Sequence, residues 1–181
     1  MAKLGNYIEK KHIPLSRYES NKHLEAYGVS NTKGIIKTDH VKSSDLSKYL
    51  VIRPGYFAYN PYRVNVGSIG LTPQNIEGLV SPAYVVFKAK EELLIPEILL
   101  DLLKSQMGLF LINKYATGTV RKALRFDDLC NIDINFPEYP KQVEIFEKIQ
   151  KCNELQREIR TSLNYSEILK EAILKEAFSN Q

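Results

Sequence analysis

The stretch KQVEIFEKIQKCNELQREIRTSLNYSEILKEAILKEAF, residues 141–178, decides the fold expected for this chain. Apolar side chains recur in it at spacings of three and four, and no proline or glycine interrupts it. This spacing predicts one long α-helix with a near-heptad apolar seam. At roughly 1.5 Å per residue the helix is about 57 Å long, so most of it is expected to project beyond its own domain. The seam consists of Ile145, Ile149, Cys152, Ile159, Leu163, Leu169 and Ile173, with Gln156 and Ser166 as polar members.

The remaining residues are enough for one domain. Domains most often hold roughly 100 to 150 residues, so we expect a domain over residues 1–139 followed by the long helix over residues 140–181. Cys130 and Cys152 have no metal-ligand spacing and are interpreted as reduced apolar residues. The N-terminus lacks the apolar core of a signal peptide, and no window approaches the roughly 20 apolar residues of a membrane span. We therefore expect a soluble, cytoplasmic protein.

The strands expected in residues 1–139 define a mixed α+β (α/β) domain with a twisted sheet of mostly short strands. Polar residues between two glycines predict a strand, an exposed turn and a second strand over residues 27–36. β-Forming runs on both sides of a Pro-Gly turn predict a strand-rich centre over residues 49–70. The apolar run after Pro82 predicts a buried strand.

One amphipathic helix is predicted over residues 95–115, because apolar residues there recur at spacings of three and four and Pro96 suits a first turn. We expect Gly108 to weaken this helix or to end it early. The shorter predicted elements are a helical turn over residues 45–48 capped by Ser43 or Ser44, a capping turn at Asp127 and Asp128, and a strand over residues 132–136.

The excess of positive charge lies in the first part of the chain. Residues 1–70 carry 11 Lys or Arg against 5 Asp or Glu, whereas residues 71–140 carry 7 against 9 and residues 141–181 carry 7 against 7. Local basicity interleaved with tyrosine suits a polyanionic partner. The alternative interpretation, a solubilising surface, stays open on charge alone.

Several short motifs occur in a particular order along the chain. They are Arg53-Pro54-Gly55-Tyr56, Gly67-Ser68-Ile69-Gly70, Val80-Ser81-Pro82-Ala83-Tyr84, a turn over residues 116–124, and Phe136-Pro137 leading to Gln142 and the long helix. In this order and spacing the chain resembles, over nearly its whole length, the specificity subunits of type I restriction–modification systems. The resemblance rests on the order of the motifs, because each motif alone is short.

The resemblance implies a DNA-binding target recognition domain joined to a helical spacer. Such subunits typically hold two recognition domains and two antiparallel spacer helices, which set the gap between two half-sites in double-stranded DNA. This chain has one domain and one helix with no internal repeat, so it resembles a half-length subunit or a fragment of a longer one. The expected partners are DNA and a methyltransferase subunit; whether a restriction or translocase subunit also joins is left open.

The apolar seam of the long helix has no partner of similar length within the chain. A lone amphipathic helix of this size would leave the seam in water. A closed two-fold contact is the commonest way to bury one repeated patch. We therefore predict a homodimer through antiparallel helices over residues 141–178, and a two-part, palindromic DNA target.

Sequence readout of DNA needs side chains with paired donors and acceptors, such as Arg for guanine and Asn or Gln for adenine. The candidates for base readout on predicted exposed turns are Ser30, Asn31, Thr32, Lys33, Tyr59, Asn60, Tyr62, Arg63 and Asn65. Phosphate contacts need cations and turn amides. The phosphate candidates are Lys33, Lys37, Thr117, Gly118, Thr119, Arg121 and Lys122. Each tyrosine has core or interface packing as its alternative role, and each lysine a solvated surface position.

No catalytic residue, metal site or cofactor site is expected in this chain, so S-adenosylmethionine is expected on a partner methyltransferase. His12, His23 and His40 lack the pairing of a metal or nucleophile site, and no P-loop is present. The Asn60-Pro61-Tyr62 run matches the Asn-Pro-Pro-Tyr signature of amino-methyltransferases only in part. Two alternatives stay open: a structural protein that uses the helix for dimerisation only, and a small stand-alone DNA-modifying enzyme.

Overall fold

The computed structural model describes residues 2–19, 23–39, 45–119 and 121–179. The chain divides into two compact units, Met1–Gln142 and Val143–Gln181, and each unit is described by itself. The cap predicted at Ser43 or Ser44 lies outside the described residues. Within the described part of the chain, no helix combines the length and the apolar character that crossing a membrane requires.

The first unit contains two four-stranded sheets. The predicted mixed α/β class with short strands is confirmed, although the strands form two sheets and not one. One sheet is antiparallel, with strand order β1-β8-β5-β6. The other has order β3-β2-β7-β4 and is antiparallel except where β2 and β7 run parallel. The strands are β1 Ile8–Lys10, β2 Glu25–Ser30, β3 Gly34–Lys37, β4 Leu50–Ile52, β5 Tyr56–Tyr59, β6 Ile69–Leu71, β7 Gly78–Val80 and β8 Val85–Ala89.

The paired strands β5 and β8 lie between two apolar core clusters and contribute side chains to both. Side chains alternate across a strand, so Phe57 and Tyr59 enter one apolar cluster while Ala58 enters another. Phe57 lies opposite Phe87 in the register, and their rings stack with centroids 4.6 Å apart. Both of these rings are fully buried. The predicted hairpin of β2 and β3 and the predicted buried strand after Pro82 are both confirmed.

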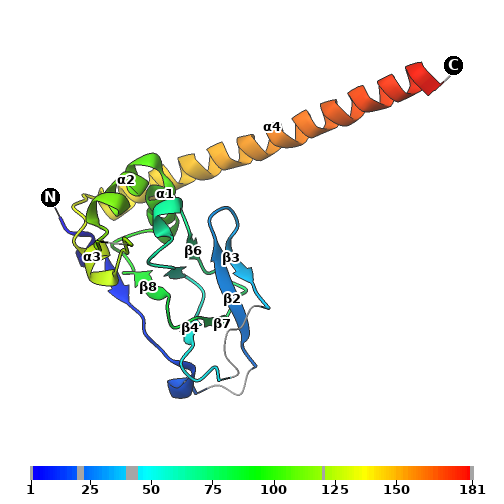
Figure 1. The fold of residues 1–181 in the computed structure, drawn as a ribbon. Helices are drawn as coiled ribbons and strands as arrows, with labels where there is room; N and C mark the ends of the chain where they lie inside the picture. The colour runs from blue at the N-terminus through cyan, green and yellow to red at the C-terminus, as the bar shows by residue number, and fades with distance from the viewer. Residues whose placement is uncertain (1, 20–22, 40–44, 120, 180–181) are drawn as a thin grey trace. The chain divides into compact units, whose positions relative to one another are not determined.

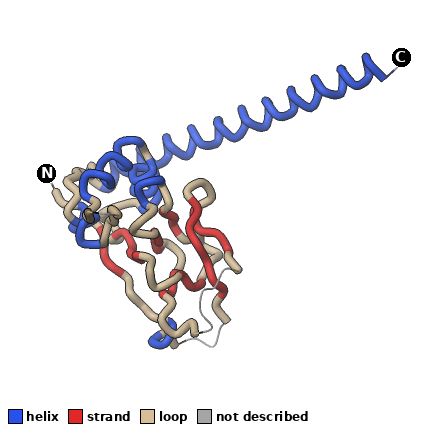
Figure 2. Tube along the Cα trace, in the orientation of Figure 1, coloured by secondary structure: helices blue, strands red, loops and turns tan. Residues whose placement is uncertain are grey.

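Helices gather at one end of the first unit, over the core cluster that contains Phe57 (Figures 1 and 2). They are α1 Pro96–Lys104, α2 Gln106–Tyr115 and α3 Phe126–Cys130. The 3₁₀ helices are η1 Leu4–Asn6, η2 Leu15–Arg17 and η3 Val64–Val66, and η2 lies at the opposite end of the unit. The predicted capping turn at Asp127 and Asp128 is the start of the short helix α3, where the Asp128 carboxylate accepts a hydrogen bond from the backbone N–H of Arg125 at 3.1 Å.

The prediction of one helix over residues 95–115 is wrong, because α1 and α2 are separate helices that meet at Ser105. The Ser105 hydroxyl donates to the Leu102 carbonyl at 2.7 Å and accepts from the Gly108 N–H at 3.1 Å, so it closes one helix and caps the next. Gly108 does not end the helix. A Cβ atom at this position would collide with the Leu102 carbonyl oxygen, so glycine allows α2 to start directly against α1.

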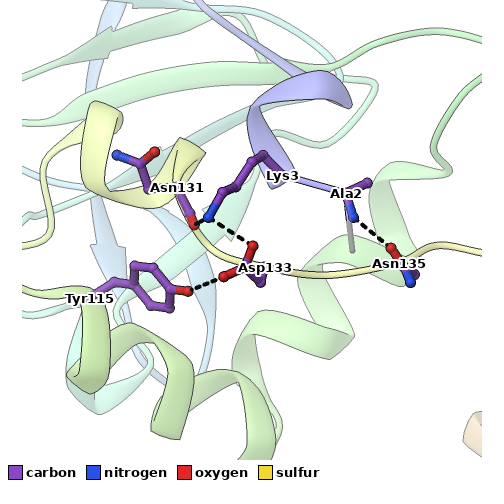
Figure 3. A network of polar contacts seen from close by, with 6 residues as sticks. All are labelled: Ala2, Lys3, Tyr115, Asn131, Asp133 and Asn135. Atoms are coloured by element: carbon purple, nitrogen blue, oxygen red, sulfur yellow. Dashed lines mark hydrogen bonds and ion pairs between the residues drawn. The ribbon is translucent and has the colours of Figure 1, made fainter.

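The predicted strand over residues 132–136 is also wrong. The segment makes only an isolated bridge, between Lys3 and Asp133, because the chain turns into η1 at Leu4 and no longer runs beside it. Side chains complete the contact (Figure 3). The Lys3 Nζ lies 2.7 Å from Asp133 Oδ1, and the Tyr115 hydroxyl donates to Asp133 Oδ2 at 2.7 Å. The side-chain Oδ1 of Asn135 accepts from the Ala2 N–H, also at 2.7 Å.

The predicted long helix is confirmed as α4, Tyr139–Ser179. In its first turn, the Gln142 side chain is 1% exposed. Its Oε1 accepts a hydrogen bond from the Ile95 N–H at 3.0 Å. Its Nε2 donates to the carbonyl oxygens of Leu93 and Pro137, at 2.8 and 2.9 Å. All of these contacts lie within the first unit, so one amide joins the start of α4 to the segment leading into α1.

Beyond the first unit, α4 carries exposed apolar side chains. Ile159, Leu163, Leu169 and Ile173 of the predicted seam are between 57% and 67% exposed in the single chain. The Cys152 side chain is also exposed, and both cysteines are free.

Replacing Gln142 with alanine will lower the free energy of unfolding by about 1–3 kcal/mol, because the Ile95 N–H and the Leu93 carbonyl lose their partner in a buried site. Urea unfolding followed by circular dichroism measures the loss. The matched control is Gln150→Ala, an exposed glutamine of the same helix, which should change little. Equal effects of the two substitutions would contradict a specific role for the buried amide.

Asp133 will contribute stability that depends on pH. The hydrogen bonds from Lys3 and Tyr115 hold the pKa of Asp133 below its ordinary value. Its contribution is therefore complete above the unfolded pKa of about 3.9 and is lost as the pH falls through the lowered folded pKa. Melting temperatures of wild type and Asp133→Asn should differ at pH 7 and converge in acid. The exposed Glu171→Gln serves as the control, and a pH-independent difference for Asp133→Asn would contradict the ion pair's role.

Candidate nucleic-acid interface

The turn between β2 and β3 presents three of the predicted base-reading side chains to solvent. The Ser30 hydroxyl oxygen accepts from the backbone N–H groups of Thr32 and Lys33, both at 3.3 Å, and so fixes the turn. Asn31, Thr32 and Lys33 are exposed, while Ser30 is half-buried. Gly34 closes the turn with φ 67°, a left-handed conformation that favours glycine. Ser30 is therefore a turn-forming residue, and the three residues after it are the accessible ones.

Residues 60–68 form a second polar segment. The Asn60 side-chain oxygen accepts from the Tyr62 N–H at 2.9 Å, which makes a local turn before η3. The Asn60 side-chain oxygen is therefore engaged in the turn. Tyr62, Arg63 and Asn65 are exposed. The Ser68 hydroxyl donates to the Val29 carbonyl at 3.0 Å, so this segment is attached beside the turn that follows β2.

The prediction that Tyr59 lies on an exposed turn is wrong. Tyr59 is the last residue of β5, and its side chain is fully buried in the core cluster on the same face as Phe57. Its hydroxyl has no hydrogen-bond partner among the described residues, and burial raises its pKa well above the ordinary value. The ring therefore packs the core and cannot reach a base.

The turn over residues 117–123 is closed by its own backbone. Thr117 and Ala123 exchange hydrogen bonds of 3.0 and 2.8 Å between their N–H and C=O groups. The Thr117 amide is therefore unavailable to a phosphate. Gly118 has φ 125°, and a Cβ there would lie 2.5 Å from the Arg121 carbonyl oxygen, so the turn requires glycine. The phosphate candidates that remain accessible in this turn are the exposed Thr119, Arg121 and Lys122 side chains.

The structure brings the second segment and this turn together. The Arg121 guanidinium carbon lies 5.0 Å from the centre of the Tyr62 ring. Behind this pair the Leu124 N–H donates to the Pro61 carbonyl at 3.0 Å, which holds the two loops together. A cation stacked on an exposed ring keeps the guanidinium edge available for hydrogen bonds. Nothing in the sequence indicates this contact, because the two residues are far apart along the chain.

Lys37 is less favourable than the other predicted phosphate contacts. Its Nζ forms an ion pair with Glu25 on the neighbouring strand β2, and this hydrogen bond raises the pKa of Lys37 and lowers that of Glu25. The Lys37 Nζ is thus already paired with a carboxylate of the protein itself. By contrast, no ion pair within the described residues involves Lys33, Arg63, Arg121 or Lys122.

Among residues 2–19, 23–39, 45–119 and 121–179, no group of three or more His, Cys, Asp or Glu side chains is placed to hold a metal ion. His40 lies outside these ranges. The accessible candidates instead combine cations, amides and an exposed aromatic ring, a composition suited to DNA edges and phosphates.

Two solved structures have the same fold over almost the whole chain. One is a chain from a structure that addresses complex assembly and conformational transition of the type I R-M system; its TM-score is 0.72 at 21% identity. The other is the HsdS subunit from Thermoanaerobacter tengcongensis, with a TM-score of 0.71 at 22% identity. Each alignment covers 99% of this chain and 48% of the other, so this chain spans about half the length of these relatives.

No protein-family model matches the chain, and no curated protein matches its sequence. At these identities the structural similarity establishes the fold. The sequence-based resemblance to type I specificity subunits is therefore confirmed at the level of the fold, which is a mixed α/β unit and a long C-terminal helix.

Proposed function

We propose that this chain is a sequence-specific DNA recognition subunit of a type I restriction–modification system, and that it is not itself catalytic. The observation that carries the proposal is the shared fold with an HsdS subunit over 99% of the chain. The exposed polar loops support it independently, because they combine the side chains that read bases with those that bind phosphates.

Base readout is assigned to the accessible part of the two polar segments. Asn31 can pair bidentately with adenine, and Arg63 can do the same with guanine in the major groove. Lys33 and Asn65 lie on the same exposed segments and add further donors. Phosphates are assigned to Arg121, stacked on Tyr62, and to the neighbouring Lys122 and Thr119. These contacts would read one half-site of a two-part target.

The chemistry on DNA is assigned to partners. In this proposal residues 1–139 serve as the target recognition domain and residues 140–181 as the spacer and dimerisation helix. A methyltransferase subunit supplies the S-adenosylmethionine site, and a restriction or translocase subunit can join the same complex. The chain contributes position and sequence choice, which require no catalytic group.

A second copy of this chain is proposed as the partner of α4. The seam residues Ile159, Leu163, Leu169 and Ile173 are exposed in the single chain, and an apolar stripe of this kind favours association. Two copies together would span nearly the length of one HsdS relative, of which one copy covers 48%. Antiparallel pairing of the two helices would place two recognition domains at a fixed separation, and the target would be palindromic.

The dimerisation-only alternative is favoured by one observation, the exposed apolar face of α4. It predicts no salt-dependent binding of DNA. Electrostatic contacts to phosphates release counterions, so log K falls with log salt by about 0.9 for each contact. The salt dependence of binding thus separates the two functions without knowledge of the target sequence.

Arg121→Ala combined with Lys122→Ala will weaken binding to a fluorescent mixed-sequence duplex and flatten its salt dependence. With about 0.9 lost for each phosphate contact, the slope should decrease by about 1.8 per bound copy. Fluorescence anisotropy across a salt series measures it. Lys170→Ala with Lys175→Ala removes two exposed cations from α4 and serves as the control. An unchanged slope in the first variant would remove this turn from the phosphate contacts.

In solution at micromolar concentration the chain will have twice the 20.8 kDa mass of one copy. Ile159→Glu with Leu163→Glu will shift it to the monomer, because two charges would be buried in the seam. The control is Thr161→Glu with Asn164→Glu, which adds the same charge on the opposite face of the helix. Light scattering after size exclusion gives the masses. A monomeric mass for the wild type would contradict the proposed dimer.

A further inference from the structure

Five cations that the base-reading and phosphate candidates do not include line two adjoining cavities of the first unit. The first cavity, of about 320 Å³, is lined by Lys10 at the end of β1, by Lys11 and His12 directly after it, and by Arg125 directly before α3. The second, of about 400 Å³, is lined by His12, Arg17 and Lys48. His12 and Pro82 line both, so the cavities form one basic groove. The basic groove is defined by Lys10, Lys11, His12, Arg17, Lys48 and Arg125.

The groove is positively charged over its whole length. Asp127 is the one carboxylate among the described residues that line it, against Lys or Arg at five positions. Glu9 lies next to it and pairs with Lys11 at 2.9 Å, but Glu9 also pairs with Lys88 at 3.3 Å. Lys88 pairs in addition with Glu91 at 3.2 Å. These two lysines are thus matched by two carboxylates, and the positive excess of the groove comes from the other four cations. Lys10, Arg17, Lys48 and Arg125 are exposed to solvent.

The wall of the groove is held by backbone hydrogen bonds from both sheets. The Lys11 N–H donates to the carbonyl of Val86 in β8 at 2.9 Å, and the N–H of Val51 in β4 donates to the Ile13 carbonyl at 2.8 Å. The segment that carries Lys11 and His12 is therefore fixed between the two sheets. Figure 1 shows this blue segment running from β1 along one side of the unit to η2. Because this backbone is fixed, the positions that carry the cations are set before any ligand binds.

The groove starts beside the pair formed by Arg121 and Tyr62. Pro61 lines the first cavity together with Arg125, and the Pro61 carbonyl accepts the Leu124 N–H that joins the two loops. Tyr62 follows Pro61 directly, and Arg121, which stacks on the Tyr62 ring, lies three residues before Leu124. Positive side chains therefore extend from Arg121 past Arg125 and Lys10 to Lys48 and Arg17. A row of separate charges in an open groove suits a repeating anion better than a single small one.

We propose that the basic groove binds the sugar–phosphate backbone of double-stranded DNA, adding sequence-independent contacts outside the base-reading loops. This inference rests on the proposed function, because it concerns the same DNA. It assigns the greater part of the electrostatic affinity to residues 10–17, Lys48 and Arg125, while the loops at residues 31–33 and 62–65 choose the sequence. Backbone contacts of this kind set the register of a protein on the duplex.

The test is the salt dependence of binding to the mixed-sequence duplex, since phosphate contacts need no particular sequence. Lys48→Ala with Arg125→Ala removes one cation from each cavity and should lower the slope by about 1.8. Lys48→Arg with Arg125→Lys keeps both charges and should keep the slope. Lys104→Ala with Lys114→Ala, cations of α1 and α2 that line neither cavity, is the matched control. Circular dichroism melting verifies that each variant is folded.

The outcomes separate the groove from the proposed function. If wild type shows no salt-dependent binding of DNA, the proposed function fails and the groove proposal fails with it. If wild type binds and the Arg121 and Lys122 variant lowers the slope, but the Lys48 and Arg125 variant keeps the wild-type slope, only the groove proposal is overturned. Binding of a polyglutamate peptide in the groove without any DNA effect would assign it to an acidic protein segment and would also overturn it.

Discussion

The buried amide of Gln142 is the contact on which the junction between the globular unit and α4 depends. The Ile95 N–H and the carbonyls of Leu93 and Pro137 lie outside regular secondary structure and would be costly to bury unpaired. One glutamine has the acceptor and the two donor hydrogens that these groups require. Its position in the first turn of α4 therefore determines where the helix starts relative to the segment that enters α1.

The polar segment over residues 60–68 follows a strand, β5, that is buried on both faces. Strands β5 and β8 place alternate side chains into two apolar clusters, which leaves no exposed face on these strands. The polar side chains that are available for binding therefore lie in the loops that connect the strands. Backbone and hydroxyl hydrogen bonds, from Leu124 to Pro61 and from Ser68 to Val29, then bring three separate connections onto one region of the unit. Loops that are joined by hydrogen bonds and carried by rigid strands hold their side chains in fixed positions, which base readout requires.

Predictions from the local sequence pattern were correct where the apolar period or the turn residues alone determine the element. They were wrong where a specific hydrogen bond or burial in the core determines it. The helix α4 and the hairpin of β2 and β3 follow from periodicity and turn residues alone. The apolar period continues across Ser105 although the helix is broken there. The break arises because the Ser105 hydroxyl forms hydrogen bonds with the end of α1 and the start of α2. Tyr59 was misplaced because it is the last residue of the buried strand β5, directly before the turn that Asn60 forms. The accessible residues of the candidate loops were found from composition, but their grouping was not.

The sequence by itself determined the long helix, the mixed α/β class and the polar character of the loops, because helical and strand periods and turn propensities are local properties of the chain. Only the tertiary structure decided which loops meet. The stacking of Arg121 on Tyr62 and the basic groove join residues that are distant in sequence. Their proximity depends on how the two sheets pack and on backbone hydrogen bonds between connections, and no local pattern records these long-range contacts.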